Sequence, residues 1–291
     1  MTPVAVIDIG TNTTRLLVAE VEDGEVVELE RRTVITRLGQ GVDATGRLAD
    51  EAMDRVAEAI AGYREVIDRL GAEKIVAVAT SAMRDSENGP DFHDYLKEKY
   101  GVDARTISGD EEARLTFLGA TAGRRADRDL VVIDIGGGST EYVAGKAGDA
   151  PSFHTSTQMG SVRFTERFLK GDPPDKREME DLAETVRQTV PDVKAEHAIA
   201  VAGTATSLAA IDGADEVHGY RLNLASCERI ASMLAGMPVE ERRNVPGLHP
   251  DRAPTIVAGA VILTESIRSL GLDEVEVSDR DILHGAALNA S

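Results

Sequence analysis

Apolar residues in this sequence fall into short runs, and their spacing predicts which runs are strands and which are helices. Consecutive aliphatic and β-branched residues at 4–9, 74–80 and 198–203 are typical of strands buried within a sheet. From residue 48 to Gly71 the apolar residues recur every three or four positions, as they do in a helix with one buried face. The apolar positions of this predicted helix are Ala52, Val56, Ile60, Tyr63, Ile67 and Leu70.

The order of the predicted elements is similar in the two halves of the chain. Each half begins with three strands, at 4–9, 13–21 and 25–38 in the first half and between 130 and about 157 in the second. Helices mixed with short strands follow in both halves. Further helices are predicted at 91–100, 162–169, 175–190, 251–271 and 281–289, and another is predicted to begin at Ser108. Because strands joined by a tight turn favour antiparallel pairing, we predict an α/β protein with mixed sheets flanked by helices.

Both halves also carry the same pentapeptide, VIDIG, at Val6–Gly10 and at Val132–Gly136, 126 residues apart. Each copy is followed by a turn of glycine and small hydroxyl residues. Glycine lets the backbone approach a ligand closely, and successive N–H groups in such a turn can form a nest that binds an anion. One such hairpin can simply turn the chain, but its repetition favours a duplicated phosphate-binding device. The candidate residues are Gly10, Thr11, Asn12, Thr13, Gly136, Gly137, Gly138, Ser139 and Thr140.

A third turn of small residues lies at 202–207, between a predicted strand and a predicted helix. The N-terminus of a helix at this place would favour a phosphate group, so Gly203 and Thr204 are further candidates. The alternative interpretation is close packing of the helix on the strand.

Length and charge narrow the class of protein. A chain of 291 residues favours two domains, which we place at 1–122 and 123–280. The net charge of −19 argues against binding of duplex DNA, and it means that a polyanionic substrate would need local cations.

Cys227 is the only cysteine, which excludes a disulfide framework within the chain. No charged and apolar leader precedes the first strand, and no apolar run is long enough for a membrane span, so we expect a cytoplasmic protein.

Five segments taken together are similar to one known family. They are VAVIDIGTNTTRLLVAE, ATSAMRDSEN, ISGDEEARLTFLGA, VVIDIGGGSTEYV and AGTATSLAA. The chain resembles the exopolyphosphatase and guanosine pentaphosphate phosphatase (Ppx/GppA) family, in its short two-domain form, from Val4 to about Ala287. The resemblance implies two actin-like (ribonuclease H-like) lobes, an active site in the cleft between them, and a C-terminal helix at 281–291 that packs back on the first lobe. It further implies a divalent cation, Mg²⁺ or Mn²⁺, and a homodimer.

The resemblance also assigns roles to particular residues. It makes Glu112 of SGDEEAR the catalytic carboxylate and Arg84 of TSAMR a contact for phosphate. Asp134 and Glu141 match the carboxylates near the metal ion, and Asp8 is the corresponding strand-end aspartate of the first hairpin. Carboxylate oxygens are ligands suited to Mg²⁺. Ser108 and Glu111 match a capping box, so we expect Glu111 to serve only as the capping partner.

The implied activity is hydrolysis of the terminal phosphoryl group of inorganic polyphosphate, with short chains favoured because the protein is short. The alternative substrate is the 5′ γ-phosphate of pppGpp, and the sequence does not decide between the two. A kinase of the same superfamily would need a pocket for an acceptor, and SGDEEAR favours the phosphatase. A nucleotide-binding regulator of the actin-like superfamily is a further alternative, which the complete set of acidic residues disfavours.

Overall fold

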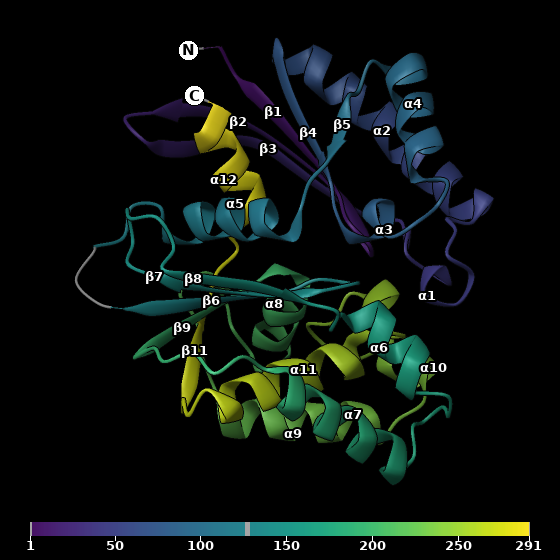
Figure 1. Cartoon of the computed structure of the whole chain (residues 1–291), viewed down its shortest axis with the longest axis vertical. Helices are drawn as coiled ribbons and strands as arrows, with labels where there is room; N and C mark the ends of the chain where they lie inside the picture. The colour runs from purple at the N-terminus through teal and green to yellow at the C-terminus, as the bar shows by residue number, and fades with distance from the viewer. Residues whose placement is uncertain (1, 126–128, 291) are drawn as a thin grey trace. The chain divides into compact units, whose positions relative to one another are not determined.

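A computed structural model describes residues 2–125 and 129–290 (Figure 1). The chain divides into two compact units. Unit 1 comprises Met1–Arg124 together with Asp281–Ser291, and unit 2 comprises Arg125–Arg280. The boundary region predicted from the sequence includes 126–128, which lie outside the described residues. Each unit is a mixed sheet with helices packed on it, so the predicted fold class is confirmed.

The sheet of unit 1 has five strands in the order β3-β2-β1-β4-β5. Its strands are β1 (Val4–Ile9), β2 (Thr13–Glu22), β3 (Glu25–Ile35), β4 (Lys74–Ala79) and β5 (Ala104–Thr106). Strand β1 pairs antiparallel with β2 and parallel with β4. The first hairpin therefore lies beside the carboxyl end of β4, and β1 is central and buried along its whole length.

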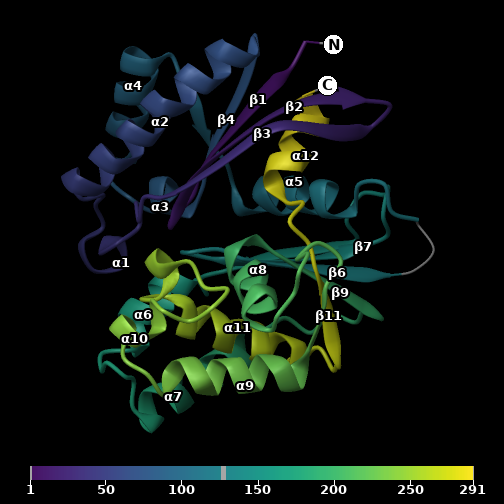
Figure 2. The same cartoon turned by 180° about the vertical axis from the view of Figure 1, so that it is seen from behind.

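Helices pack on both faces of the sheet of unit 1, as Figures 1 and 2 show from opposite sides. The helices are α1 (Val42–Thr45), α2 (Asp50–Leu70), α3 (Ser81–Arg84), α4 (Gly89–Tyr100), α5 (Gly109–Thr121) and α12 (Ile282–Ala290). Helices α2 and α4 pack on one face, in a core that includes Ile7 and Ile60. On the other face, α12 places Leu283 and Ala287 against β1 and β2.

The helix predicted to end at Gly71 is confirmed. Gly71 follows α2 with a φ of 68°, in the left-handed region that favours glycine. The N–H of Gly71 donates to the carbonyl of Asp68, which closes the last turn. The end of this helix can be predicted from the sequence, because the apolar spacing ends where a glycine supplies the left-handed conformation that the helix end requires.

The sheet of unit 2 has six strands in the order β10-β11-β9-β6-β7-β8. They are β6 (Leu130–Ile135), β7 (Thr140–Gly145), β8 (Phe153–Thr157), β9 (His197–Val201), β10 (Arg221–Asn223) and β11 (Glu274–Val277). Strand β6 pairs antiparallel with β7 and parallel with β9. The first three strands and the parallel neighbour of the first strand are thus arranged as in unit 1.

Six α-helices and one short 3₁₀ helix are described in unit 2 over residues 129–280. They are α6 (Ser161–Phe168), α7 (Lys176–Thr189), α8 (Ala202–Ile211), α9 (Leu224–Ala235), α10 (Val239–Arg242), η1 (Pro250–Arg252) and α11 (Ile256–Ser269). The main core forms between the sheet and these helices, with α11 at its centre, where every residue from Ile256 to Ile267 is buried. Among the described helices of the whole chain, none is both long and apolar enough to cross a membrane.

Candidate active site

The turns of the two hairpins close in the same way. In the first, the N–H of Gly10 donates to the carbonyl of Thr13 at 2.9 Å. In the second, the N–H of Gly136 donates to the carbonyl of Ser139 at 3.0 Å. The two copies of VIDIG, 126 residues apart, are therefore followed by turns of the same conformation as well as having the same sequence.

In the second turn, three successive carbonyls are all bound on one side. The carbonyl of Gly136 accepts from the N–H of Ser161, at the start of α6, at 3.0 Å. The carbonyl of Gly137 accepts from the next two N–H groups of α6, and Nε of Arg163 donates to the carbonyl of Gly138 at 2.8 Å. In a planar trans peptide the N–H points opposite to the carbonyl. The N–H groups of Gly137, Gly138 and Ser139 therefore point away from α6, side by side, as an anion-binding nest requires.

The turn of the first hairpin is held in a similar way by the segment after β3. The carbonyl of Thr11 accepts from the N–H of Gly39 at 2.8 Å, and the carbonyl of Asn12 accepts from the N–H groups of residues 36 and 37. The N–H groups of Asn12 and Thr13 consequently point away from that segment. Oδ1 of Asn12 is also buried and has no hydrogen-bond partner among the described residues.

Two candidate side chains of the turns are engaged within the protein, one by a hydrogen bond and one by packing. The hydroxyl of Thr140 donates to the carbonyl of Met159 at 2.5 Å. The methyl group of Thr11 lies where a Cβ on Gly39 would stand, at 2.2 Å. In these hairpins the backbone N–H groups, more than these hydroxyl groups, are the donors left to face a ligand.

One position distinguishes the two hairpins. Asp8 of β1 stands opposite Arg15 of β2, whereas Asp134 of β6 stands opposite Glu141 of β7. The first hairpin therefore pairs a carboxylate with a cation, and the second places two buried carboxylates side by side. One of the oxygens of Glu141 accepts from the hydroxyl of Ser156 at 2.7 Å, which fixes that side chain.

Asp8 belongs to a buried group of three charges in unit 1. Oδ2 of Asp8 accepts from Nε and Nη2 of Arg15 at 2.9 and 2.7 Å, while Nη1 of Arg15 pairs with Asp281. Oδ1 of Asp8 is buried and lacks a hydrogen-bond partner among the described residues. Burial raises the pKa of Asp8 despite the opposing charge of Arg15. For Asp281, burial acts in the same direction, but Arg15 and the other partners together hold its pKa below the usual value.

Glu112 and Arg84 lie together in unit 1. Glu112 is buried in the first turn of α5, and its Oε2 is 3.4 Å from Nη1 of Arg84. The same Nη1 donates to the carbonyl of Ile107 at 2.9 Å, which holds the guanidinium in place. The structure thus brings the predicted catalytic carboxylate and the predicted phosphate contact into an ion pair.

The predicted capping box at α5 is only half formed. The hydroxyl of Ser108 accepts from the N–H of Glu111 at 3.2 Å, as expected. The carboxylate of Glu111 instead pairs with both terminal nitrogens of Arg105. The prediction that Glu111 acts as a capping partner is therefore wrong, because a bidentate guanidinium on the neighbouring strand competes better for the carboxylate.

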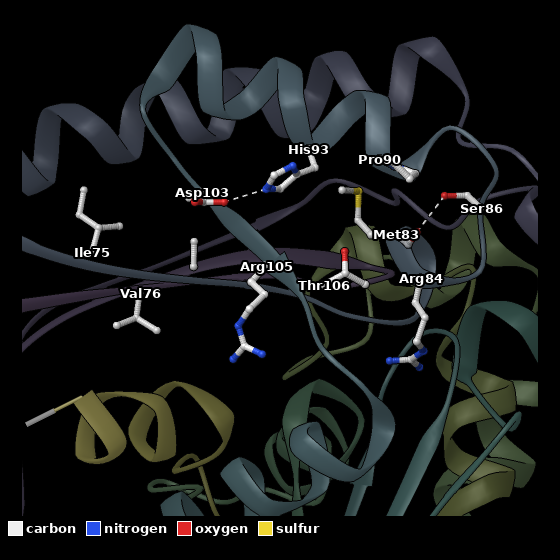
Figure 3. Close-up of a pocket in the computed structure, with 11 residues that line it drawn as sticks. Ile75, Val76, Met83, Arg84, Ser86, Pro90, His93, Asp103, Arg105 and Thr106 are labelled. Carbon is white, nitrogen blue, oxygen red and sulfur yellow. Dashed lines mark hydrogen bonds and ion pairs between the residues drawn. The ribbon is translucent and has the colours of Figure 1, made fainter.

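A groove of about 800 Å³ runs beside Arg84 along the edge of β5 (Figure 3). Arg84 and Arg105 extend on the same side of the strand, and His93 points toward Asp103. The cations of this groove are already balanced, since Arg105 pairs with Glu111 and His93 lies 2.8 Å from Asp103. Because it offers little surplus positive charge, the groove does not favour a polyanion.

The third turn begins α8 with a residue in an unusual conformation. Ala202 has a φ of 63°, a region in which non-glycine residues are uncommon and which is often associated with functional sites. The guanidinium of Arg252 lies directly on Gly203, where a Cβ would come within 1.8 Å of Nη1. Thr204, by contrast, is buried against Gly259 of α11. Arg252 is not among the residues predicted from the sequence, because it lies 49 residues from Gly203 and belongs to no local motif.

The candidate residues thus form two sets, one within each unit. Asp8, Arg84 and Glu112 belong to unit 1 with the first turn, and Asp134 and Glu141 belong to unit 2 with the other two turns. Over residues 2–125 and 129–290, no three side chains of His, Cys, Asp or Glu gather as a complete metal-binding group. The two adjacent carboxylates of unit 2 nevertheless have the donor chemistry of a partial Mg²⁺ site, since this ion usually keeps several waters.

Comparisons with known proteins identify one family. The sequence profile of the Ppx/GppA phosphatase family matches residues 17–290. A protein named exopolyphosphatase 2, from Mycobacterium tuberculosis, is 39% identical, and the alignment covers 99% of this chain and 98% of the relative. A crystal structure of the Aquifex aeolicus member of the Ppx/GppA family has a TM-score of 0.83 at 30% identity, over 99% of this chain and 97% of that one. An exopolyphosphatase from Cytophaga hutchinsonii, at 24% identity, shares the fold with a TM-score of 0.91 over 99% and 98% of the two chains.

Proposed function

Since the chain belongs to the Ppx/GppA phosphatase family, we propose that it is an exopolyphosphatase, which hydrolyses the terminal phosphoanhydride bond of inorganic polyphosphate. Short chains are the preferred substrates in this proposal. The two compact units are the two domains, and each contributes one phosphate-binding hairpin. We further place the protein in the cytoplasm as a homodimer.

The observation that carries this proposal is the orientation of the hairpin N–H groups. The nest of Gly137, Gly138 and Ser139 offers donors to the oxygens of one phosphate group, and the turn at Asn12 and Thr13 offers donors to another. Backbone donors cannot rearrange on binding, so they stabilise charge that develops on phosphate oxygens without a cost in reorganisation. A polyphosphate chain presents such oxygens on every unit.

Glu112 is the residue proposed to orient the attacking water. Its carboxylate accepts a hydrogen bond from that water and takes its proton as the water oxygen bonds to the terminal phosphorus. The bond from that phosphorus to the bridging oxygen breaks, so that phosphate and a polyphosphate shorter by one unit are the products. Arg84 holds Glu112 by an ion pair and remains partly exposed, so its guanidinium can also contact the terminal phosphoryl group. Arg252, on the Gly203 turn of unit 2, is a further proposed phosphate contact.

A divalent cation, Mg²⁺ or Mn²⁺, is part of the proposal. The donors that fit it are Asp134 and Glu141, which are adjacent, buried carboxylates, and Oδ1 of Asp8, a buried oxygen with no hydrogen-bond partner in the described part of the chain. When bound, the cation neutralises phosphate oxygens and so lowers the repulsion between the substrate and a protein of charge −19.

The test is phosphate release from polyphosphates of several lengths, pppGpp and ATP, each with Mg²⁺ and with excess chelator. We expect release from polyphosphate with Mg²⁺ and loss of release with chelator. Faster release from pppGpp would assign the alternative activity of the family. Nucleotide-dependent assembly without any phosphate release would favour a regulator of the actin-like superfamily.

A further inference from the structure

We infer that Asp281 is a positioning residue of the candidate site, which holds Asp8 in one orientation through Arg15. The inference rests on the proposed function, because it concerns the use of Asp8 at that site. It also gives α12 a role in the chemistry, since Asp281 immediately precedes this helix.

The first support is the way in which Arg15 divides its donors. Nε and Nη2 both donate to Oδ2 of Asp8, and Nη1 pairs with Asp281. The exposed fractions of the three side chains are 16% for Arg15, 5% for Asp8 and 6% for Asp281. Because a guanidinium is a rigid planar fork, two carboxylates at its two edges fix its orientation. Oδ1 of Asp8 is then the oxygen left for a ligand.

The second support is the comparison of the two hairpins. Arg15 occupies the register position that Glu141 occupies in unit 2. In the first hairpin the positive charge beside the aspartate is therefore supplied by Arg15 itself. A guanidinium facing one carboxylate favours bidentate pairing, with one nitrogen on each oxygen. Here Nε and Nη2 both lie on Oδ2 instead, while Asp281 holds Nη1 and so fixes the tilt of the guanidinium that leaves Oδ1 of Asp8 available.

The third support is the attachment of Asp281 to the helix that carries Glu112. Oδ1 of Asp281 accepts from the N–H of Leu283 at 3.0 Å and so binds the first turn of α12. A Cβ on Gly119 of α5 would stand 2.0 Å from the carbonyl oxygen of Asp281. The backbones of α5 and α12 are therefore in direct contact. Asp281 is connected both to Asp8, through Arg15, and to the helix of Glu112.

The experiment compares Asp281→Asn with His284→Gln. Asparagine keeps an oxygen for the N–H of Leu283 but removes the charge that engages Arg15. His284 lies one turn further along α12, where it contacts Glu28 and Arg31. Its charge also acts on Asp281, but it makes no hydrogen bond to Arg15, so its substitution disturbs α12 while leaving the pairing of Arg15 with Asp281 in place. The measurements are kcat and KM for polyphosphate at saturating Mg²⁺, thermal melting, and Mn²⁺ affinity by electron paramagnetic resonance.

We expect Asp281→Asn to lower kcat by about 10- to 100-fold, the scale of a misplaced catalytic group, with KM changed by less than about 3-fold. Mn²⁺ affinity should fall as well. His284→Gln should leave kcat and Mn²⁺ affinity within about 2-fold of the wild type, even where it lowers the melting temperature. In the double variant Asp8→Asn with Asp281→Asn, kcat should equal that of Asp8→Asn alone, because the two residues act through one group.

Wild-type kcat in folded Asp281→Asn, or additive losses in the double variant, would overturn the inference while leaving the proposed function intact. Wild-type kcat in Asp8→Asn would instead remove Asp8 from the proposed site, and the inference with it. If Asp281→Asn does not fold, Asp281→Ser replaces it, since serine also binds the first turn of a helix but is too short to hold Arg15. The same outcomes then apply to Asp281→Ser.

Discussion

Gly285 of α12 lies against Leu115 of α5 so closely that a Cβ on the glycine would stand 1.8 Å from the carbonyl oxygen of Leu115. The carbonyl belongs to a helix backbone and cannot move aside alone. Together with Gly119, this contact brings the two helices together without intervening side chains.

Gly285→Ala should therefore destabilise the protein by about 3 kcal/mol or more, at the upper end of the range for overpacking. Urea unfolding measures the effect. Gly62→Ala is the matched control, because Gly62 lies within α2 and a Cβ there would meet no atom of another element within 4 Å. That variant should gain about 0.5–1 kcal/mol from helix propensity. Equal stabilities of the two variants would contradict the close contact.

Glu112→Gln should lower kcat by about 10²–10⁴-fold, the usual contribution of a general base, and leave the fold intact. Glutamine keeps the shape of the side chain but cannot take a proton from water. The control is Glu111→Gln, which weakens only a partly exposed ion pair with Arg105 and should cost less than about 1 kcal/mol of stability. The two variants are compared by steady-state kinetics at saturating Mg²⁺ and by thermal melting. Near-native kcat in both variants would show that the first turn of α5 takes no part in the mechanism.

Gly160→Ala should disturb the second phosphate-binding turn. A Cβ at Gly160 would stand 2.2 Å from the carbonyl oxygen of Gly137, so α6 would have to withdraw from the turn that it holds. We expect a drop of about 10- to 100-fold in kcat/KM, because the N–H groups of the turn lose their alignment. Gly236→Ala, with a φ of −79° and its closest contacts at 3.5 Å, should be close to neutral in the same assay.

Stability in acid should depend on Glu28. A hydrogen bond with His284, opposed by burial and supported by Arg31, lowers the pKa of Glu28 from its usual 4.5. A depressed carboxylate pKa contributes stability above the unfolded value, and this contribution disappears as the pH falls through the folded pKa. Glu28→Gln should thus be less stable than the wild type at neutral pH, and the difference should shrink below about pH 4.5. Urea unfolding across that range measures it, with Glu73→Gln, at an exposed position, as the control.

The sequence predicted those features that depend on neighbouring residues. The helix end at Gly71 and the two hairpins follow from local patterns, and the structure has them. The ion pair of Arg15 with Asp281 joins residues 266 positions apart, so no local sequence pattern predicts it. The capping role predicted for Glu111 is wrong because its carboxylate pairs with Arg105. That contact depends on how β5 and α5 pack together, which the local pattern does not show.

One element outside the predictions does carry local signals. Helix α9 is absent from the predicted helices, although Asn223 is a favourable capping residue and its side chain accepts from the N–H of Ser226. Gly236 then follows the last residue of the helix. Both ends of α9 can therefore be read from the sequence, even though the segment carries no candidate chemistry.

The division of unit 1 between two parts of the chain has a consequence for synthesis on the ribosome. Helix α12 emerges only after all of unit 2 has been translated, yet it covers one face of β1 and β2 with Leu283, Ala286 and Ala287. Until then that face of the nascent sheet stays uncovered. Strand β11, which lies inside the sheet of unit 2, comes directly before α12 in the chain. We therefore expect both units to complete their cores late in translation, although the sheet of unit 1 is synthesised first, so that unit 1 depends longer on chaperones.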